Sequence, residues 1–166
     1  MNEYRTHTCG QLRAADVGQT VLLAGWIHKK RNLGNLCFVD LRDHYGITQC
    51  VFDSSSDLFE KIQNLRLESV IGIEGVVIMR ESINKNIPTG DIEIKVQKLT
   101  VHSEADTLPF QVSFEDDSPE ELRLKYRFLD LRKERIHNNI VLRSKVIFRM
   151  RELMLEQGFT EYPAWR

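Results

Sequence analysis

The chain has 166 residues, of which 42% are hydrophobic and 28% charged, and its formal net charge is −1. This length suits one domain of ordinary size, or a small domain with part of another. No apolar run approaches the roughly 20 residues that span a bilayer, so no membrane partner is expected. The first ten residues lack the apolar stretch of a secretory signal, so the cytoplasm is the expected location.

The cysteines, histidines and motifs point away from metal binding and catalysis. Cys9, Cys37 and Cys50 form an odd set without C-x-x-C spacing, which argues against a disulfide framework and a structural zinc site. The five histidines have no metal-ligand spacing, and the chain contains no P-loop, G-x-S-x-G or H-E-x-x-H motif. We therefore expect three reduced thiols, no metal site and no catalytic residue.

The charge is unevenly distributed along the chain. From Pro119 to Arg166 there are 11 Lys and Arg against 7 Asp and Glu, whereas the rest of the chain has 12 against 17. Such a split is consistent with a chain in two parts, although charged helix surfaces also produce it.

The first hundred residues are short β-branched and aliphatic segments separated by turn residues, which predicts strands. Asp57–Leu65 changes to a helical period, with Asp57 and Glu60 spaced as in a capping box. Strands are predicted at Thr20–Lys29, Leu36–Asp43, Gly46–Asp53, Ser69–Met79 and Asp91–Val101. This mainly β order, with one helix between strands three and four, is typical of the five-stranded OB-fold barrel, which binds oligonucleotides and oligosaccharides. A generic small β-barrel is the alternative.

Residues 103–118 are polar and acidic and contain a helix-breaking proline, which predicts a linker. Helices are expected beyond it, at Glu120–Leu131 and Asn138–Gln157. An apolar stripe on the second helix ends at Gly158, a suitable C′ residue. Its members are Leu142, Val146, Met150 and Leu153. Two helices can hardly form a core alone, so we expect this segment to belong to a larger domain.

The strand Leu36–Asp43 separates into an apolar and a mixed face, because β side chains alternate. The apolar face carries Cys37, Val39 and Leu41, and the mixed face Phe38, Asp40 and Arg42. Phe38 is thus an aromatic residue on the polar side. A nucleic-acid base could stack on it, or it could pack under a loop, and the pattern leaves both open.

Three further features favour nucleic-acid binding without deciding it. The basic run His28–Arg31 could neutralise phosphates or be a solvated turn. Glu93 alternates with aliphatic residues, so it points away from the core and could accept from a base or be an ordinary surface residue. Gln49 could read a base edge, but it shares its face with Ile47 and Val51, so the period leaves its role undecided.

Several long motifs resemble the N-terminal region of bacterial-type aspartyl-tRNA synthetase, a class II aminoacyl-tRNA synthetase. They are CGQLR (Cys9–Arg13), GWIHKKRNLGNLCFVDLRD (Gly25–Asp43), GITQCVFD, TGDIEI (Thr89–Ile94) and LRLKYRFLDLR (Leu122–Arg132). The resemblance covers nearly the whole chain. It implies an anticodon-binding OB domain over residues 1–102, a linker over 103–118, and hinge helices with the start of a catalytic domain over 119–166.

The resemblance also implies roles for single residues. An aromatic residue at the position of Phe38 stacks on the central anticodon base, and a glutamine at the position of Gln49 hydrogen-bonds it. The other implied RNA-binding residues are the basic Lys29 and Arg31, the loop arginine Arg80, and Glu93, which helps to read the first anticodon base. Lys29 stands where an arginine is often found, and it lacks the planar fork of that side chain.

The parent enzyme that the resemblance implies attaches aspartate to tRNA with ATP and Mg²⁺, as a homodimer formed through its catalytic domain. GFTEYP resembles the opening of class II motif 1, and motifs 2 and 3 do not follow before Arg166. We therefore expect a fragment that needs no cofactor, is inactive alone and binds the anticodon stem-loop of tRNA-Asp. The alternatives are the ligase itself, needing only the missing domain, and a general single-stranded nucleic-acid-binding OB protein.

Overall fold

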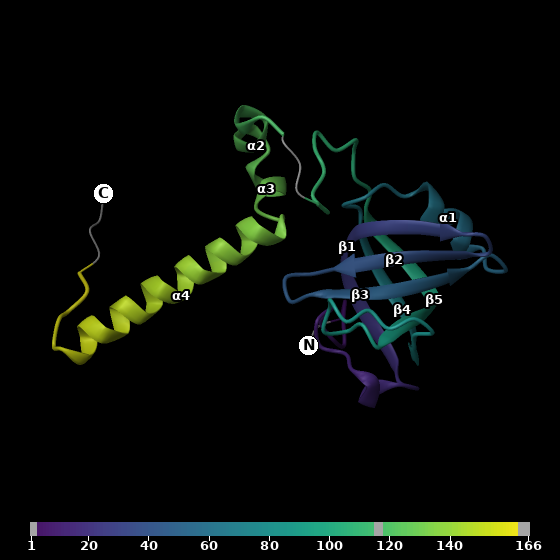
Figure 1. The fold of residues 1–166 in the computed structure, drawn as a ribbon, viewed down its shortest axis with the longest axis horizontal. Coiled ribbons are helices and arrows are strands. Elements are labelled where there is room, and N and C mark those ends of the chain that lie inside the picture. The colour runs from purple at the N-terminus through teal and green to yellow at the C-terminus, as the bar shows by residue number, and fades with distance from the viewer. Residues whose placement is uncertain (1–2, 115–117, 163–166) are drawn as a thin grey trace. The chain divides into compact units, whose positions relative to one another are not determined.

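The computed structural model describes residues 3–114 and 118–162. The chain divides into two compact units, Met1–Leu108 and Pro109–Arg166, each with its own elements (Figure 1). The last residue of GFTEYP and the rest of the predicted start of the catalytic domain, residues 163–166, lie outside the described residues, as do residues 115–117 of the predicted linker.

The first unit is a closed barrel of five strands (Figure 1). The strands are β1 (Thr20–Leu33), β2 (Leu36–Arg42), β3 (Ile47–Asp53), β4 (Val70–Met79) and β5 (Ile92–Ser103). They follow the order β1-β2-β3-β5-β4, and β1 also pairs with β4 to close the sheet. All pairs are antiparallel except β3 with β5. The helix α1 (Leu58–Asn64) stands between β3 and β4, and a short 3-10 helix, Ala14–Asp16, precedes β1. The predicted mainly β OB-type order is confirmed.

Alternating residues of the strands fill the barrel. The inward residues of β2 are fully buried, as the alternation predicts, and those of the other strands join them in one core. The fully buried members include Val21, Leu23, Ile27, Cys37, Val39, Leu41, Cys50, Ile71, Val77, Ile92 and Ile94. All three cysteines are free thiols and buried, as expected. This leaves the outer face of β2 for polar residues and Phe38.

A β-bulge in β1 changes which residues of this strand face outward. Ile27 pairs with β2 in regular register, the register shifts, and Lys29 is the next residue to pair, opposite Asp40. His28 is therefore an extra residue, and the alternation after it is reversed. As a result Lys29 and Arg31 lie on the outer face, although odd-numbered residues earlier in β1 face the core.

Lys30 differs from its basic neighbours because its ammonium group is bound within the barrel domain. Its Nζ donates hydrogen bonds to the carbonyl oxygens of Ile62 at 3.2 Å, Gln63 at 2.7 Å and Leu65 at 2.6 Å. These carbonyls lie at the end of α1, where a helix has no internal donors left. Lys30 thus caps α1. Strand one also continues to Leu33, four residues beyond the end predicted at Lys29.

The predicted capping box at the start of α1 is also wrong. Asp57 has helical backbone angles, φ −57° and ψ −16°, and its side chain makes no capping hydrogen bond. A capping residue normally has an extended backbone that aims its side chain at the first turn. Instead, Oγ of Ser56 accepts a hydrogen bond from the backbone N–H of Leu58 at 3.2 Å.

The second unit contains α2 (Glu120–Lys125), α3 (Arg127–Asp130) and α4 (Glu134–Glu156). The single helix predicted over Glu120–Leu131 is interrupted at Tyr126, where φ is −108° and ψ 46°. Phe110, Val112 and Leu129 are buried here, and they form a much smaller set than the barrel core.

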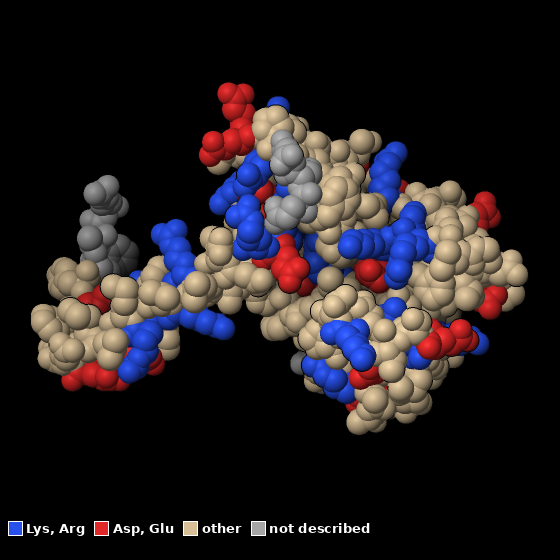
Figure 2. Space-filling view, in the orientation of Figure 1, with Lys and Arg blue, Asp and Glu red and all other residues tan. Residues whose placement is uncertain are grey.

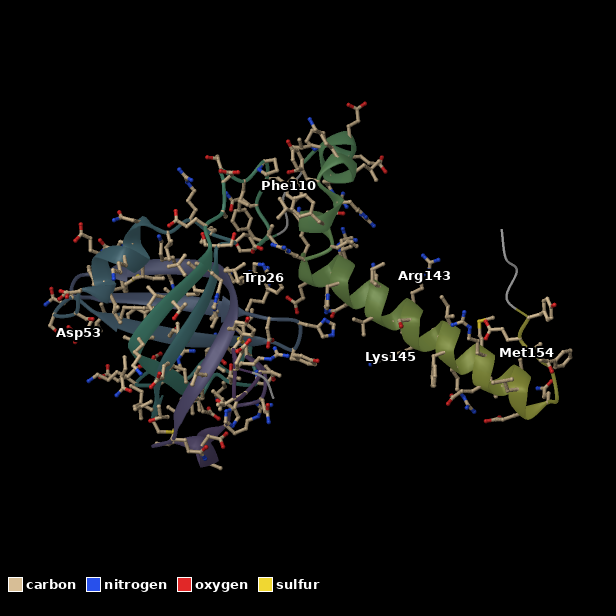
Figure 3. The ribbon with its side chains drawn as sticks, turned by 180° about the vertical axis from the view of Figure 1, so that it is seen from behind. Trp26, Asp53, Phe110, Arg143, Lys145 and Met154 are labelled. Carbon is tan, nitrogen blue, oxygen red and sulfur yellow. The ribbon has the colours of Figure 1, made fainter. Side chains whose placement is uncertain are left out.

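The helix α4 presents its apolar residues to solvent. No residue of α4 is buried, and the predicted stripe from Leu142 to Leu153 is 40% to 61% exposed. Side chains such as Arg143, Lys145 and Met154 project from the helix (Figure 3). Gly158, with φ +84°, ends it as predicted.

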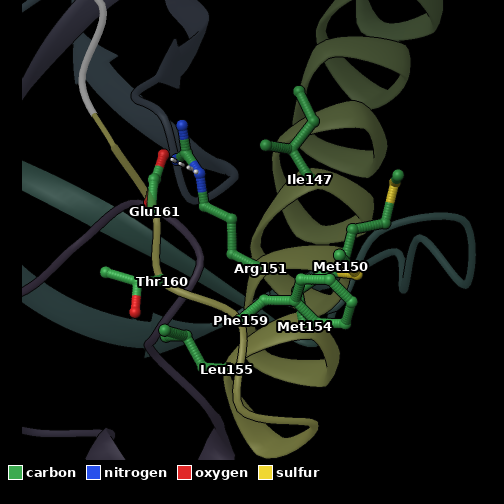
Figure 4. Close-up of a pocket in the computed structure, with 8 residues that line it drawn as sticks. All are labelled: Ile147, Met150, Arg151, Met154, Leu155, Phe159, Thr160 and Glu161. Atoms are coloured by element: carbon green, nitrogen blue, oxygen red, sulfur yellow. Dashed lines mark ion pairs between the residues drawn. The ribbon is translucent and has the colours of Figure 1, made fainter.

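After Gly158 the chain turns back along α4 and encloses a shallow apolar hollow (Figure 4). Arg151 and Glu161 form an ion pair of 3.1 Å at its edge. Ile147, Met150, Met154, Leu155, Phe159 and Thr160 complete the lining. In the described part of the chain, no helix is both long and apolar enough to cross a membrane.

Candidate nucleic-acid interface

A hollow of about 290 Å³ opens on the outer face of the barrel, over β2, β3 and β5. Its lining consists of Arg31, Leu33, Leu36, Phe38, Gln49, Arg80, Glu81, Ser82 and Glu93. Five of the six residues proposed from the sequence to bind RNA are therefore brought together. The sixth, Lys29, is exposed on the same strand as Arg31 and pairs in register with Asp40 of β2.

Phe38 lies in the middle of β2, between Arg31 of β1 and Val51 of β3 in the sheet register. It is half-buried and on the outer face, as the alternation of β2 predicts. Leu33 and Leu36 line the hollow with it, so the ring belongs to an apolar edge of an otherwise polar depression. A flat ring in this position can stack with a nucleic-acid base.

Gln49 is the centre of a polar network on the floor of the hollow. Its Oε1 accepts hydrogen bonds from Nη2 of Arg31 at 3.0 Å and from Nη2 of Arg80 at 2.9 Å. Its Nε2 donates to Oε2 of Glu93 at 2.7 Å. Gln49 is only 3% exposed, because these partners cover it. The sequence left the role of Gln49 undecided, and the structure aims it into the hollow.

Burial raises the pKa of two carboxyl groups, one in the hollow and one beside it. Burial raises the pKa of Glu93, while the hydrogen bond from Gln49 and the charge of Arg80 act in the opposite direction. Burial also raises the pKa of Asp40, whose carboxylate lies 3.9 Å from the guanidinium of Arg31. Both carboxylates are thus partly desolvated, and for Glu93, which lines the hollow, this strengthens a hydrogen bond to a ligand.

His28 belongs to a different part of the surface. Nη1 of Arg42 contacts Nδ1 of His28 at 2.8 Å, and Nη2 of Arg42 donates to both carboxylate oxygens of Glu68 at 2.9 Å. Burial, together with the charges of Arg42 and Lys29, lowers the pKa of His28 to about 4. Of the predicted basic run, only Lys29 and Arg31 remain available to phosphates.

Leu33, Leu36, Glu81 and Ser82 also line the hollow, and sequence reasoning did not find them. Leu33 is 66% exposed and pairs with Leu36, so two apolar side chains meet at the edge of the hollow. An apolar residue beside the turn at Gly34 was the available signal. Glu81 and Ser82 follow β4 in a polar loop and gave no comparable signal.

The arrangement combines an aromatic ring, two guanidinium groups, an amide and a carboxylate. These groups can stack on a base, hydrogen-bond its edge and neutralise phosphate. Basic and acidic side chains are interspersed on the barrel face seen in Figure 2. Among residues 3–114 and 118–162, no group of three His, Cys, Asp or Glu residues could hold a metal ion.

The fold and this hollow define the class of the protein. Residues 21–101 match the family of the OB-fold nucleic acid binding domain. Residues 119–163 match the class II tRNA synthetases of the D, K and N group. The first unit is thus an OB-fold nucleic-acid-binding domain, followed by a segment of a class II synthetase.

Comparison with individual proteins narrows this class. The chain is 55% identical to an aspartate–tRNA(Asp/Asn) ligase of Paramagnetospirillum magneticum, over 98% of this chain and 19% of the relative. It is 56% identical to the ligase of that name from Zymomonas mobilis, over 98% of this chain and 28% of the relative. A solved structure of a putative aspartyl-tRNA synthetase from Leishmania major covers 99% of this chain, with a TM-score of 0.85 and 25% identity, over 36% of its own length.

The chain belongs to the aspartyl-tRNA synthetase family and carries its OB-fold anticodon-binding domain. The resemblance to the bacterial-type family is confirmed. The chain spans between about a fifth and somewhat more than a quarter of the length of these two curated relatives.

Proposed function

We propose that the barrel binds the anticodon stem-loop of tRNA-Asp, and that the hollow contacts the anticodon bases. One observation carries this proposal: side chains from β1, β2, β3, β5 and the loop after β4 meet around a single depression. They are Arg31, Phe38, Gln49, Arg80 and Glu93. The names of the curated relatives, which include both tRNA-Asp and tRNA-Asn, support a tRNA ligand.

Each residue has a role that its chemistry supports. Phe38 stacks on the central anticodon base, and Gln49 hydrogen-bonds the edge of that base. Glu93 accepts a hydrogen bond from the first anticodon base. Lys29, exposed beside the hollow, contributes positive charge near the RNA backbone.

The longer protein to which this chain corresponds attaches aspartate to tRNA with ATP and Mg²⁺, in the cytoplasm, as a homodimer formed through its catalytic domain. The chain itself binds tRNA and does not activate aspartate. Aspartate-dependent pyrophosphate exchange checks this directly. Exchange catalysed by this chain alone would contradict the proposal.

Residues 1–102 form the anticodon-binding domain in this proposal, 103–118 the linker, and 119–166 the hinge helices and the start of the catalytic domain. The family match that ends at residue 101 supports the first boundary. Limited proteolysis tests the linker. Cleavage within residues 103–118 that leaves a resistant barrel is expected, and equal resistance along the whole chain would contradict it.

The test of RNA binding compares the wild-type chain with Phe38→Ala, using anticodon stem-loops of tRNA-Asp and tRNA-Asn and a loop with a changed central base. We expect tight binding of a natural stem-loop, weaker binding of the altered loop, and a loss of affinity in the variant. Equal affinity for all loops, with a strong salt dependence, would instead indicate a general single-strand binder.

A further inference from the structure

We infer that Arg31 and Arg80 are positioning residues that fix the orientation of the Gln49 amide, so that Gln49 meets RNA only as a hydrogen-bond donor. This inference rests on the proposed function of the hollow. It gives the two arginines a part in base discrimination, in addition to the attraction that their charges exert on phosphate.

The oxygen of the Gln49 amide is already occupied. Nη2 of Arg31 and Nη2 of Arg80 both donate to Oε1, at 3.0 and 2.9 Å. An amide oxygen has two lone pairs, so two donors use its accepting capacity. Both donors are charged, which places these contacts among the stronger hydrogen bonds.

The nitrogen of the same amide has one N–H group left for a ligand. Nε2 carries two N–H groups, and one donates to Oε2 of Glu93 at 2.7 Å. The second N–H is the part of Gln49 that can address a ligand in the hollow. An incoming base must therefore offer a carbonyl oxygen or a ring nitrogen at this point.

The opposite orientation of the amide is unfavourable. Turning it by half a rotation would place the NH₂ group against two guanidinium groups and the oxygen against the carboxylate of Glu93. Donor would face donor and acceptor would face acceptor, in a side chain that is 3% exposed and so receives little help from water. The three partners, which come from β1, β5 and the loop after β4, select one orientation.

This fixed orientation has a consequence for specificity. A freely turning amide can donate to a carbonyl or accept from an amino group, so it tolerates several bases. A fixed amide leaves a mismatched amino group facing an N–H donor. With its orientation fixed, Gln49 therefore accepts fewer bases than a freely turning amide does.

The test removes one positioning contact and measures discrimination as well as affinity. Arg80→Met is preferred to a change at Arg31, because Arg31 also lies near Asp40. Dissociation constants are measured for four stem-loops that differ only in the central base. Arg66→Met removes an arginine from an exposed part of the barrel, where it contacts the carbonyl of Ala105, and is the matched control.

We expect the ratio between the best and the worst loop to fall in Arg80→Met by roughly 5- to 150-fold, the value of one specific base contact. Arg80→Lys should restore part of the ratio, and Arg66→Met should leave it unchanged. If Arg80→Met weakens all four loops equally and lowers the salt slope by about 0.7, Arg80 serves as a phosphate contact and the inference is wrong.

A second measurement needs no RNA and separates this inference from the proposed function. The Gln49 side-chain N–H that donates to Glu93 should exchange slowly with solvent in ¹⁵N spectra of the wild type, and faster in Arg80→Met. Fast exchange in the wild type would overturn the inference even if RNA binds. Absence of base preference in the wild type, with slow amide exchange, would instead overturn the proposed function.

Discussion

Lys30→Met should destabilise the barrel while leaving its RNA-contacting charges in place. The substitution keeps an unbranched apolar side chain but removes the ammonium group that donates to three carbonyl oxygens at the end of α1. A hydrogen bond that involves a charged group contributes about 1.5 to 3 kcal/mol, and a cation at a helix C-terminus contributes about 0.3 to 1 kcal/mol. Because Lys30 is only partly buried and water can replace some of its contacts, we expect a net loss of about 2 kcal/mol.

The assay is thermal unfolding of the whole chain, followed by the β-sheet signal in circular dichroism. For a unit of this size, a loss of about 2 kcal/mol lowers the midpoint by roughly 8 to 10 °C. The matched control is Lys98→Met, which removes a lysine whose side chain is 72% exposed and pairs with Glu74 at 2.9 Å. An exposed pair contributes only about 0 to 1 kcal/mol. Equal midpoints for the two variants would refute the capping role of Lys30.

The same variant separates structure from binding when it is compared with Lys29→Met. Lys29 is exposed beside the hollow, so its loss should weaken stem-loop binding and lower the salt slope by about 0.7 without changing the midpoint. Lys30→Met should lower the midpoint and leave the salt slope unchanged. The reversed pattern would contradict the placement of Lys29 on the outer face and of Lys30 at the end of α1.

Three further outcomes follow from the packing of the barrel. Gly10→Ala should cost about 2 to 3 kcal/mol in urea unfolding, because its Cβ would lie 2.2 Å from the backbone oxygen of Tyr45, and an unchanged midpoint would refute the close approach. Arg42→Met should cost about 3 to 5 kcal/mol in the same assay, since it leaves the buried carboxylate of Glu68 without its bidentate partner, and a loss below about 1 kcal/mol would contradict this. The pKa of His28 is lowered to about 4, so the unfolded chain binds the extra proton and stability falls as the pH drops from about 6.5 to about 4. After a discount for the partial exposure of His28, we expect the wild type to lose about 1 to 2 kcal/mol more stability than His28→Gln over this window. Parallel pH profiles of the two proteins would contradict this role of His28.

The sequence predicts β2 well because this strand is regular. Strict alternation over seven residues places Cys37, Val39 and Leu41 inside and Phe38 outside, and the structure agrees. The same rule fails for β1. Val21 faces the core, so continued alternation would place Lys29 inside as well, and the extra residue at the bulge reverses this. A bulge depends on pairing with other strands, and the local sequence of β1 does not reveal it.

The sequence could not predict the polar network of the hollow, because this network also depends on how distant strands pair. Gln49 lies 18 residues from Arg31, 31 from Arg80 and 44 from Glu93, and closure of the barrel brings them together. Periodicity can say that a residue leaves the core. It cannot say which residues from other strands it will meet, and therefore it left Gln49 undecided.

In the C-terminal unit, the local features of α4 were predicted and a break in the preceding helix was not. The apolar stripe and the glycine that ends α4 were read correctly, since both are local patterns. The break at Tyr126 was missed because the segment from Glu120 to Leu131 contains no proline or glycine that would interrupt a helix. Helix continuity there depends on packing within the unit, where Asp130 is fully buried against Arg123 and Arg127.

The most direct test of the account maps the stem-loop onto the barrel by NMR titration. Addition of the anticodon stem-loop of tRNA-Asp should shift the backbone amide signals of Phe38 and Glu93 and the side-chain amide of Gln49, and Phe38→Ala should reduce affinity by about 5- to 150-fold, the effect of one stacked base. Tyr45→Ala, which removes an exposed aromatic residue outside the hollow, should bind as the wild type does. Shifts confined to α4 or to the β2–β3 turn, with the hollow unaffected, would contradict the assignment of this surface to RNA.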